Sequence, residues 1–311
     1  MKLRIPWFVR LLVSAAVLAY LLTQAPLSSL GQAFRSVPPS LGLAVLAAFL
    51  VGHVVSAYKW WGLTTLFAAI PRHLALRAHF TGLVGNLCLP GVAGGDLVRA
   101  ACVMHKPEGR GGILLACAAD RLIDCCALLL LSLAGALWMV QVSDWLRHTI
   151  LITGGFAVLA LIIVLVASRA RSEESQGRLR RLVNSLALLV RNPWILLRTL
   201  VLALLVQGSF VMLNGLLGSA AGVEVSFAAW FFAWPLAKLV ATLPVSLGGL
   251  GVREATLVVL LQPVGGDPAA VTCAGLLWYG VLVAGGLIGG LAVLAPTQWG
   301  RASLEKAACG E

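Results

Sequence analysis

Two stretches of this sequence place a helix-breaking segment before an arginine, a combination that could hold a phosphate group inside a membrane. Residues 89–99 read LPGVAGGDLVR and residues 243–253 read LPVSLGGLGVR. Both follow the pattern L-P-x-x-x-G-G-x-x-V-R, with an offset of 154 residues. Proline interrupts the helical hydrogen-bond ladder and glycine opens the backbone, so freed amides at a helix N-terminus can bind an anion. The arginine adds a planar set of donors that suits phosphate.

We therefore expect a phosphate site in which Arg99 and Arg253 are the main ligands. An unpaired charge in hydrocarbon is costly, so these arginines should face a polar cavity or a partner. The other residues expected at this site are Gly94, Gly95, Gly248, Gly249 and Ser246, with Arg121 and Lys238 as assisting cations. The alternative is a structural ion pair that pins each hairpin, with Asp96 and Glu254 as the nearest acids.

A third cluster, Asp120-Arg121-x-x-Asp124, places two carboxylates four residues apart on one helix face. It is either a local salt bridge at the membrane interface, or a counter-charge for Arg99 or a proton or ion relay. The histidines are scattered and show no metal-ligand spacing. The sequence indicates no catalytic motif, no metal site and no cofactor.

Composition places these motifs in a membrane. Of 311 residues, 60% are hydrophobic and 11% are charged, against about 25% charged in a soluble domain. A cytosolic globular enzyme and a disordered protein are thereby excluded. A spanning helix needs about 20 apolar residues. Six uncharged or nearly uncharged runs provide one each, at residues 11–34, 36–58, 112–140, 149–167, 193–218 and 269–294. We predict an all-α polytopic membrane protein that is a single integral domain, 1–311.

Basic residues set the predicted topology. Cytoplasmic loops are rich in Lys and Arg, and the densest basic segment is 168–193. This segment stays inside if residues 78–105 and 227–261 are re-entrant hairpins, broken by proline and glycine, that do not cross. Both termini are then cytoplasmic, residues 24–38, 141–148 and 219–226 are external, and Lys59 follows the second span on the cytoplasmic side. The net charge of +11 reflects these loops, and we expect no nucleic-acid partner.

The order of elements repeats in the two halves. Each half contains two spans, a broken hairpin and a third span, and the halves start on opposite sides. We predict an inverted-topology repeat with halves 1–147 and 148–300. Such repeats are common in secondary transporters, whose sites lie near the midplane at broken helices.

The motifs resemble the lysylphosphatidylglycerol synthase transmembrane region, the flippase-like membrane domain of the bacterial multiple peptide resistance factor. The matching pieces are Tyr58-Lys59-Trp60-Trp61, LPGVAGGDLVR, Asp120-Arg121-x-x-Asp124 and LPVSLGGLGVRE, in family order. Asp120 stands where the family pattern has Glu. Because the chain ends at Glu311, we expect a stand-alone member without the synthetase domain.

The resemblance implies a flippase that moves an anionic, aminoacylated or polyprenyl-type lipid across the bacterial inner membrane. The alternatives are a membrane-embedded transferase and an accessory subunit of a lipid-linked biosynthetic enzyme. The expected partner is a membrane lipid with an anionic headgroup, and the sequence leaves a homodimer open.

Overall fold

The computed structural model of the protein describes residues 27–88, 93–104, 110–139, 191–242 and 249–294, with a few isolated positions outside these ranges. All regular elements in these ranges are helices. Three of them, α3 (Pro39–Thr64), α9 (Pro193–Ala220) and α12 (Pro268–Leu294), are long and apolar enough to cross a membrane. Helix α6 (Arg110–Trp138) is equally long but carries charges in its first half. The predicted all-α membrane fold is therefore confirmed.

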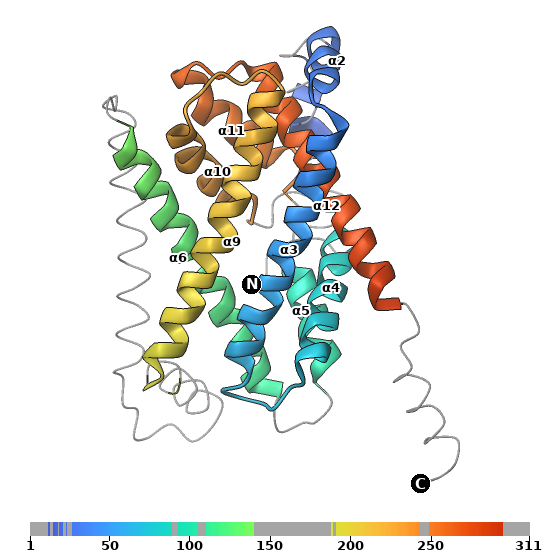
Figure 1. Ribbon diagram of the computed structural model, residues 1–311, viewed down its shortest axis with the longest axis vertical. Coiled ribbons are helices and arrows are strands. Elements are labelled where there is room, and N and C mark those ends of the chain that lie inside the picture. Colours follow the sequence, from blue (N-terminus) through green and yellow to red (C-terminus); the bar gives the residue numbers. More distant parts are fainter. Residues whose placement is uncertain are drawn as a thin grey trace.

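Two pairs of short helices lie among the long ones. Helix α4 (Arg72–Cys88) packs against α5 (Ala93–Val103), and α10 (Phe227–Ala241) packs against α11 (Val252–Leu261). The first pair occupies the lower half of the molecule and the second the upper half, so that the connected ends of both pairs point toward the middle (Figure 1). The connecting residues 89–92 and 243–248, which contain Pro90 and Pro244, lie outside the described ranges.

The directions of the helices follow the inverted order that the sequence predicts. Helix α3 runs from the upper to the lower end and α6 returns, whereas α9 runs upward and α12 returns downward (Figure 1). The first hairpin connects to α3 and α6 at the lower end, and the second connects to α9 and α12 at the upper end. The spans predicted at 11–34 and 149–167, the repeat boundary at 147/148 and most of the basic segment 168–193 lie outside the described residues.

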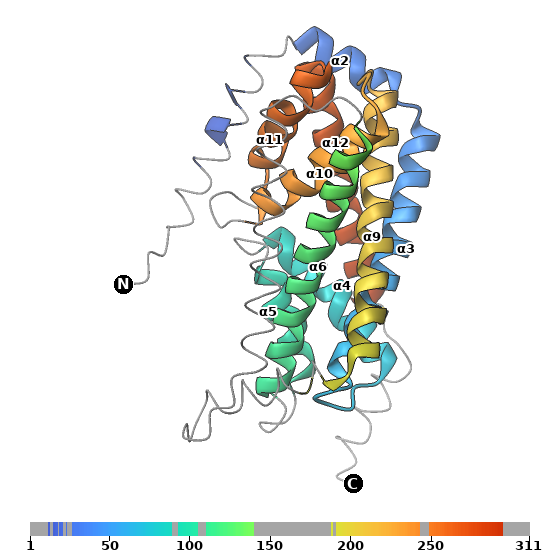
Figure 2. The same cartoon turned by 90° about the vertical axis from the view of Figure 1, so that its left-hand side faces the viewer.

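Proline fixes the start of each long apolar helix. Pro39, Pro193 and Pro268 each stand at the beginning of their helix, where the missing amide hydrogen is not needed. A short helix, α2 (Leu27–Ser36), precedes α3 and lies across the upper end of the molecule, against α12 (Figure 2). The run at residues 11–34 is therefore not one continuous span up to residue 34.

The second predicted span is displaced toward the C-terminus. It was expected at residues 36–58, with Lys59 on the cytoplasmic side, but α3 continues to Thr64. Lys59 and Trp60 are consequently inside the bundle, with 2% and 0% of their surfaces exposed. Nothing in the sequence between Tyr58 and Thr64 interrupts a helix, so the helix ends only where a bend is required before α4.

The second hairpin is embedded in the bundle by small residues on its neighbours. A Cβ at Gly135 of α6 would lie 2.4 Å from the backbone nitrogen of Phe232, so glycine allows α6 to contact the α10 backbone. Ser132 Oγ donates a hydrogen bond of 3.0 Å to Phe232 O at the same crossing. This close packing holds α10 at a fixed depth beside α6.

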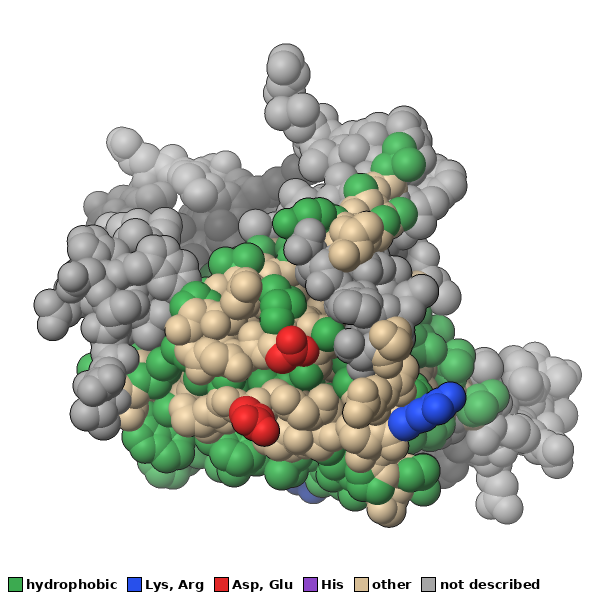
Figure 3. Space-filling view, turned by 90° about the horizontal axis from the view of Figure 1, so that it is seen from above, with side chains coloured by type: hydrophobic (Ala, Val, Ile, Leu, Met, Phe, Trp, Pro, Cys, Tyr) green, Lys and Arg blue, Asp and Glu red, His purple; other side chains and the backbone are tan. Residues whose placement is uncertain are grey.

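The two ends of the molecule differ in charge. The upper end, seen along the long axis, is largely hydrophobic or neutral with few charged side chains (Figure 3). The described connections at this end carry Arg35, Glu224 and Asp267. The lower end carries the basic residues Arg72 and Arg77 in the first two turns of α4, Arg110 at the start of α6 and Arg191 just before α9.

Candidate functional site

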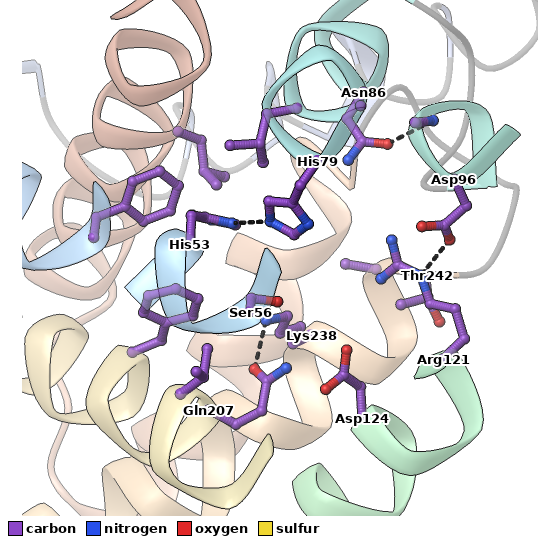
Figure 4. A pocket seen from close by; sticks show the side chains of 18 of the residues that line it. His53, Ser56, His79, Asn86, Asp96, Arg121, Asp124, Gln207, Lys238 and Thr242 are labelled. Carbon is purple, nitrogen blue, oxygen red and sulfur yellow. Dashed lines mark hydrogen bonds and ion pairs between the residues drawn. The ribbon is translucent and has the colours of Figure 1, made fainter. Parts of the chain in front are cut away.

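A cavity of about 210 Å³ lies in the middle of the bundle, where the two hairpins approach each other. Helices α3 to α6 and α9 to α12 all contribute side chains to its wall. Figure 4 shows polar groups from several of these helices pointing into the same space. The polar lining consists of His53, Ser56, His79, Asn86, Asp96, Arg99, Asp120, Arg121, Asp124, Gln207, Lys238, Thr242, Arg253 and Tyr279.

Asp120 joins the first hairpin to two long helices. Its Oδ2 lies 3.1 Å from Arg99 Nη2 on α5, and its Oδ1 lies 3.0 Å from Lys59 Nζ on α3. The three side chains are between 1% and 5% exposed. The Arg99 guanidinium also lies over the Trp60 ring, 4.5 Å from its centroid. Asp120 is thus the predicted counter-charge for Arg99, and the cluster is not a salt bridge at the interface.

Three further charges extend this group into an ion-pair network. Asp96 Oδ1 lies 3.1 Å from Arg99 Nη2, and the other oxygen of Asp96 binds Arg121. Asp124 binds Lys59. The network contains three cations and three carboxylates, so it is neutral as a whole. Desolvated charges of this kind are tolerated because each has an opposite charge within contact distance.

The second hairpin has its own neutral pair. Glu254 is fully buried, and its Oε1 accepts a hydrogen bond of 3.1 Å from Arg253 Nε. Its Oε2 accepts a bond of 2.8 Å from Gly251 N at the start of α11. Arg253 Nη2 also donates to Gly275 O on α12, at 3.1 Å. The Arg253–Glu254 pair therefore ties the tip of the second hairpin to α12. This agrees with the alternative expectation that the pair is a structural ion pair that pins the hairpin.

Lys238 on α10 stands apart from both groups. Its Nζ donates a hydrogen bond of 2.7 Å to Gln207 Oε1 on α9. It lies 4.9 Å from the Trp234 ring centroid and 5.4 Å from that of Phe210. Among the described carboxylates none lies within ion-pair distance of Lys238. Asp124 faces the same space (Figure 4) but already binds Lys59. Lys238 is thus the surplus positive charge of the described cavity wall.

Two histidines from different helices form a directed hydrogen-bond chain. His79 Nδ1 lies 3.5 Å from Arg99 Nη1, and arginine can only donate, so this nitrogen is the acceptor. The ring proton of His79 is then on Nε2, which lies 3.1 Å from His53 Nδ1 (Figure 4). Both rings are neutral in this arrangement, and they add no charge to the cavity.

Gly95 in the first helix break allows α4 and α5 to pack closely, and its amide is not free to bind an anion. The Gly95 amide donates a bond of 2.9 Å to Asn86 Oδ1 and so is not available for a lipid phosphate. A Cβ at Gly95 would lie 2.3 Å from Gly82 O, which shows how closely α5 approaches α4. In the second break, Gly249 and Gly251 have φ angles of 80° and 81°, which glycine adopts without strain. The expected anion site at the Gly94–Gly95 amides is therefore wrong for Gly95.

The offset between the two broken stretches also relates residues across the cavity. Positions 154 residues apart contribute paired lining residues: His53 and Gln207, Ser56 and Phe210, Leu87 and Ala241, Arg99 and Arg253, and Asp124 and Trp278. Most of these pairs differ in residue type, so sequence identity does not reveal them. The repeat with halves 1–147 and 148–300 stays a prediction, and these paired positions agree with its offset of 154 residues.

The structure brings most of the predicted site residues together. Seven of them line the cavity: Gly95, Asp96, Arg99, Asp120, Arg121, Asp124 and Lys238. Arg253 does so as well, with Glu254 bonded behind it. Gly94 is buried in α5, and Gly249 approaches Ala241 on α10. Gly248 and Ser246 lie outside the described residues.

Several site residues were not predicted from the sequence. Arg198 is exposed on α9, with its guanidinium 4.8 Å from the Tyr58 ring centroid. Lys59, in contrast, is buried in the ion-pair network. The signal for Lys59 was the Asp120/Asp124 pair, because two buried carboxylates on one helix face require more than one cation. His53, His79, Asn86 and Gln207 also line the cavity and were not expected at the site.

The geometry suits binding of a polar anionic group. Among the described residues that line the cavity, one cation, Lys238, has no ion-pair partner, and the adjoining walls supply hydroxyl, amide and imidazole groups. The remaining charges are mutually compensated and hold the hairpins in position. A headgroup bound here would sit in the middle of the bundle, between elements that enter from its two ends.

The chain belongs to a known membrane family. Residues 7–290 match the family model of the lysylphosphatidylglycerol synthase TM region, which covers nearly the whole sequence. No curated protein matches the chain. The membership confirms the resemblance drawn from the motifs and indicates a lipid-related function in a membrane.

Proposed function

We propose that this member of the lysylphosphatidylglycerol synthase TM region family moves a phosphate-bearing lipid between the two leaflets of a bacterial inner membrane. The observation that carries the proposal is the central cavity, which is lined by two hairpins from opposite ends and in which Lys238 of the second hairpin has no ion-pair partner among the described residues. A headgroup site at half depth is what a carrier needs in order to be reached from both sides.

Both hairpins are bonded to the long helices around the cavity. The first hairpin is held by ion pairs from Arg99 and Asp96 to α6, and the second by the bond from Arg253 to α12. A hairpin can move as a unit only if its bonds to the neighbouring long helices break and are replaced at the same time. Acyl chains would remain in the bilayer while the headgroup crosses through the cavity.

The orientation follows from the charge of the two ends. We place the lower end, with Arg72, Arg77, Arg110 and Arg191, in the cytoplasm. In a background without native cysteines, a cysteine at Glu224 should react with an impermeant thiol reagent on intact cells. A cysteine at Thr65 should react only after permeabilisation. The opposite labelling pattern would reverse the proposed orientation.

The test of transport is a leaflet-resolved assay in proteoliposomes that contain phosphatidylglycerol. The protein should accelerate the appearance of this lipid in the opposite leaflet over protein-free vesicles. A preparation that binds lipid but leaves the leaflet distribution unchanged would refute transport. It would favour the accessory or transferase role.

A further inference from the structure

The charges around the cavity can be counted from the described residues. The network of Lys59, Arg99, Arg121, Asp96, Asp120 and Asp124 is neutral, and so is the pair Arg253–Glu254. The two undescribed segments that adjoin the hairpin tips, 89–92 and 243–248, contain no charged residue. The surplus on the described wall is therefore one positive charge, on Lys238.

The side chains around the Lys238 ammonium contact it with uncharged groups only and supply no counter-ion. An ammonium has three donors, and the Gln207 oxygen accepts one of them at 2.7 Å. The faces of Trp234 and Phe210 attract a cation, at 4.9 and 5.4 Å from their centroids. All of these partners are uncharged, so an anionic ligand is the group that would remove the remaining cost of a buried charge.

A second donor lies one helical turn away on the same face of α10. Trp234 lines the cavity and is 1% exposed, and its Nε1 has no hydrogen-bond partner among the described residues. Trp234 and Lys238 are separated by four residues and therefore share a helix face. A buried indole N–H without a partner is uncommon, because buried polar groups are normally hydrogen-bonded.

We infer that Lys238 and Trp234, together with Gln207, select a lipid headgroup with a single net negative charge. This inference rests on the proposed function and specifies its substrate class. A phosphodiester has one negative charge, and its two free oxygens can accept from Nζ and Nε1. A zwitterionic headgroup has no net charge, so the cavity would keep its surplus of one positive charge. An aminoacylated headgroup with a net positive charge would add to that surplus, so it is the least favoured ligand.

The selectivity of the unmodified protein is the first test. The protein in detergent micelles is exposed to equal amounts of phosphatidylglycerol, phosphatidylethanolamine and lysylphosphatidylglycerol, and bound lipid is counted by native mass spectrometry. We expect phosphatidylglycerol to bind roughly 10- to 100-fold more tightly than phosphatidylethanolamine, the ratio that corresponds to one charged hydrogen bond. Lysylphosphatidylglycerol should bind most weakly. This test needs no variant and therefore does not depend on the folding of a mutant.

A charge placed beside Lys238 is the second test. Gln207→Glu puts a carboxylate where the amide oxygen lies 2.7 Å from Nζ, so it supplies the missing counter-ion without removing the lysine. Phosphatidylglycerol binding should fall to the level of phosphatidylethanolamine, and Lys238→Gln should have the same effect. Arg198→Gln removes one positive charge from the exposed side of α9, away from the cavity, and should leave the preference unchanged.

The outcomes separate this inference from the proposed function. Binding of lysylphosphatidylglycerol that equals or exceeds that of phosphatidylglycerol would overturn the inference. So would an unchanged preference in both folded Gln207→Glu and Lys238→Gln. Transport of another lipid in the leaflet-resolved assay would then still uphold lipid movement. Absence of transport for all three lipids would reject the proposed function, whichever lipid binds.

Discussion

Replacement of Asp120 by asparagine should destabilise the protein, because Asp120 is shared by two buried cations. The substitution preserves shape but removes one negative charge from a neutral network. Lys59 and Arg99, which lie 3.0 and 3.1 Å from its oxygens, are 1% and 5% exposed at their side chains. After the change, three cations face two carboxylates. Loss of one partner of a buried pair costs about 3–5 kcal/mol.

A loss near the smallest value of that range is expected, because Arg99 and Lys59 each keep one carboxylate partner. Arg99 retains Asp96 at 3.1 Å, and Lys59 retains Asp124. The free energy of unfolding should therefore fall by about 3 kcal/mol for Asp120→Asn. The measurement is reversible unfolding in mixed detergent micelles, followed by tryptophan fluorescence.

A double variant provides the internal control. Adding Lys59→Met to Asp120→Asn restores equal numbers of cations and carboxylates in the network. The two substitutions should therefore be coupled by about 1–3 kcal/mol, in the sense that the second costs less when the first is present. A loss below about 0.5 kcal/mol for Asp120→Asn, or strict additivity of the two changes, would refute the shared-counter-ion account.

Two other predictions concern the packing and polarity of the same region. Gly275→Ala should destabilise by about 1–3 kcal/mol, because the new Cβ would lie 2.6 Å from Glu254 Cγ, whereas Gly280→Ala on the same helix meets nothing within 4 Å. Thermal unfolding of both variants tests this, and equal behaviour would contradict it. His79→Gln keeps one acceptor for Arg99 and one donor, so it should preserve stability. His79→Leu should lose about 1–3 kcal/mol by leaving buried polar groups unpaired, and an equal loss in both variants would contradict the directed chain.

The fold class and the need for charged pairs were predictable because they follow from the length of the uncharged runs and from the cost of a buried charge. Long uncharged runs have one stable environment, the bilayer. A buried arginine requires a counter-charge, which made Asp96 the nearest candidate for Arg99 and a counter-charge one of the roles left open for Asp120. Proline and glycine at matching offsets indicated the two hairpins, and the structure has a pair of short helices on either side of each break.

The missed residues depend on contacts between distant segments. Lys59 follows an aromatic residue at the end of an apolar run, the usual pattern of a membrane interface. Its burial is determined by Asp124, which is 65 residues away on α6. His53 and His79 are ordinary histidines on separate helices until the first hairpin brings them within 3.1 Å. The Gly95 amide looked available because its acceptor, Asn86, is on the other helix of the hairpin.

The most direct test of the account is the rate at which phosphatidylglycerol crosses between leaflets, per reconstituted protein molecule, in Lys238→Gln and Arg198→Gln. Each variant removes one positive charge, but only Lys238 lies in the cavity. We predict a loss of roughly tenfold or more for Lys238→Gln, the effect of removing one charged hydrogen bond, and a rate equal to that of the unmodified protein for Arg198→Gln. Equal rates in the two variants and the unmodified protein would contradict a headgroup path through the cavity.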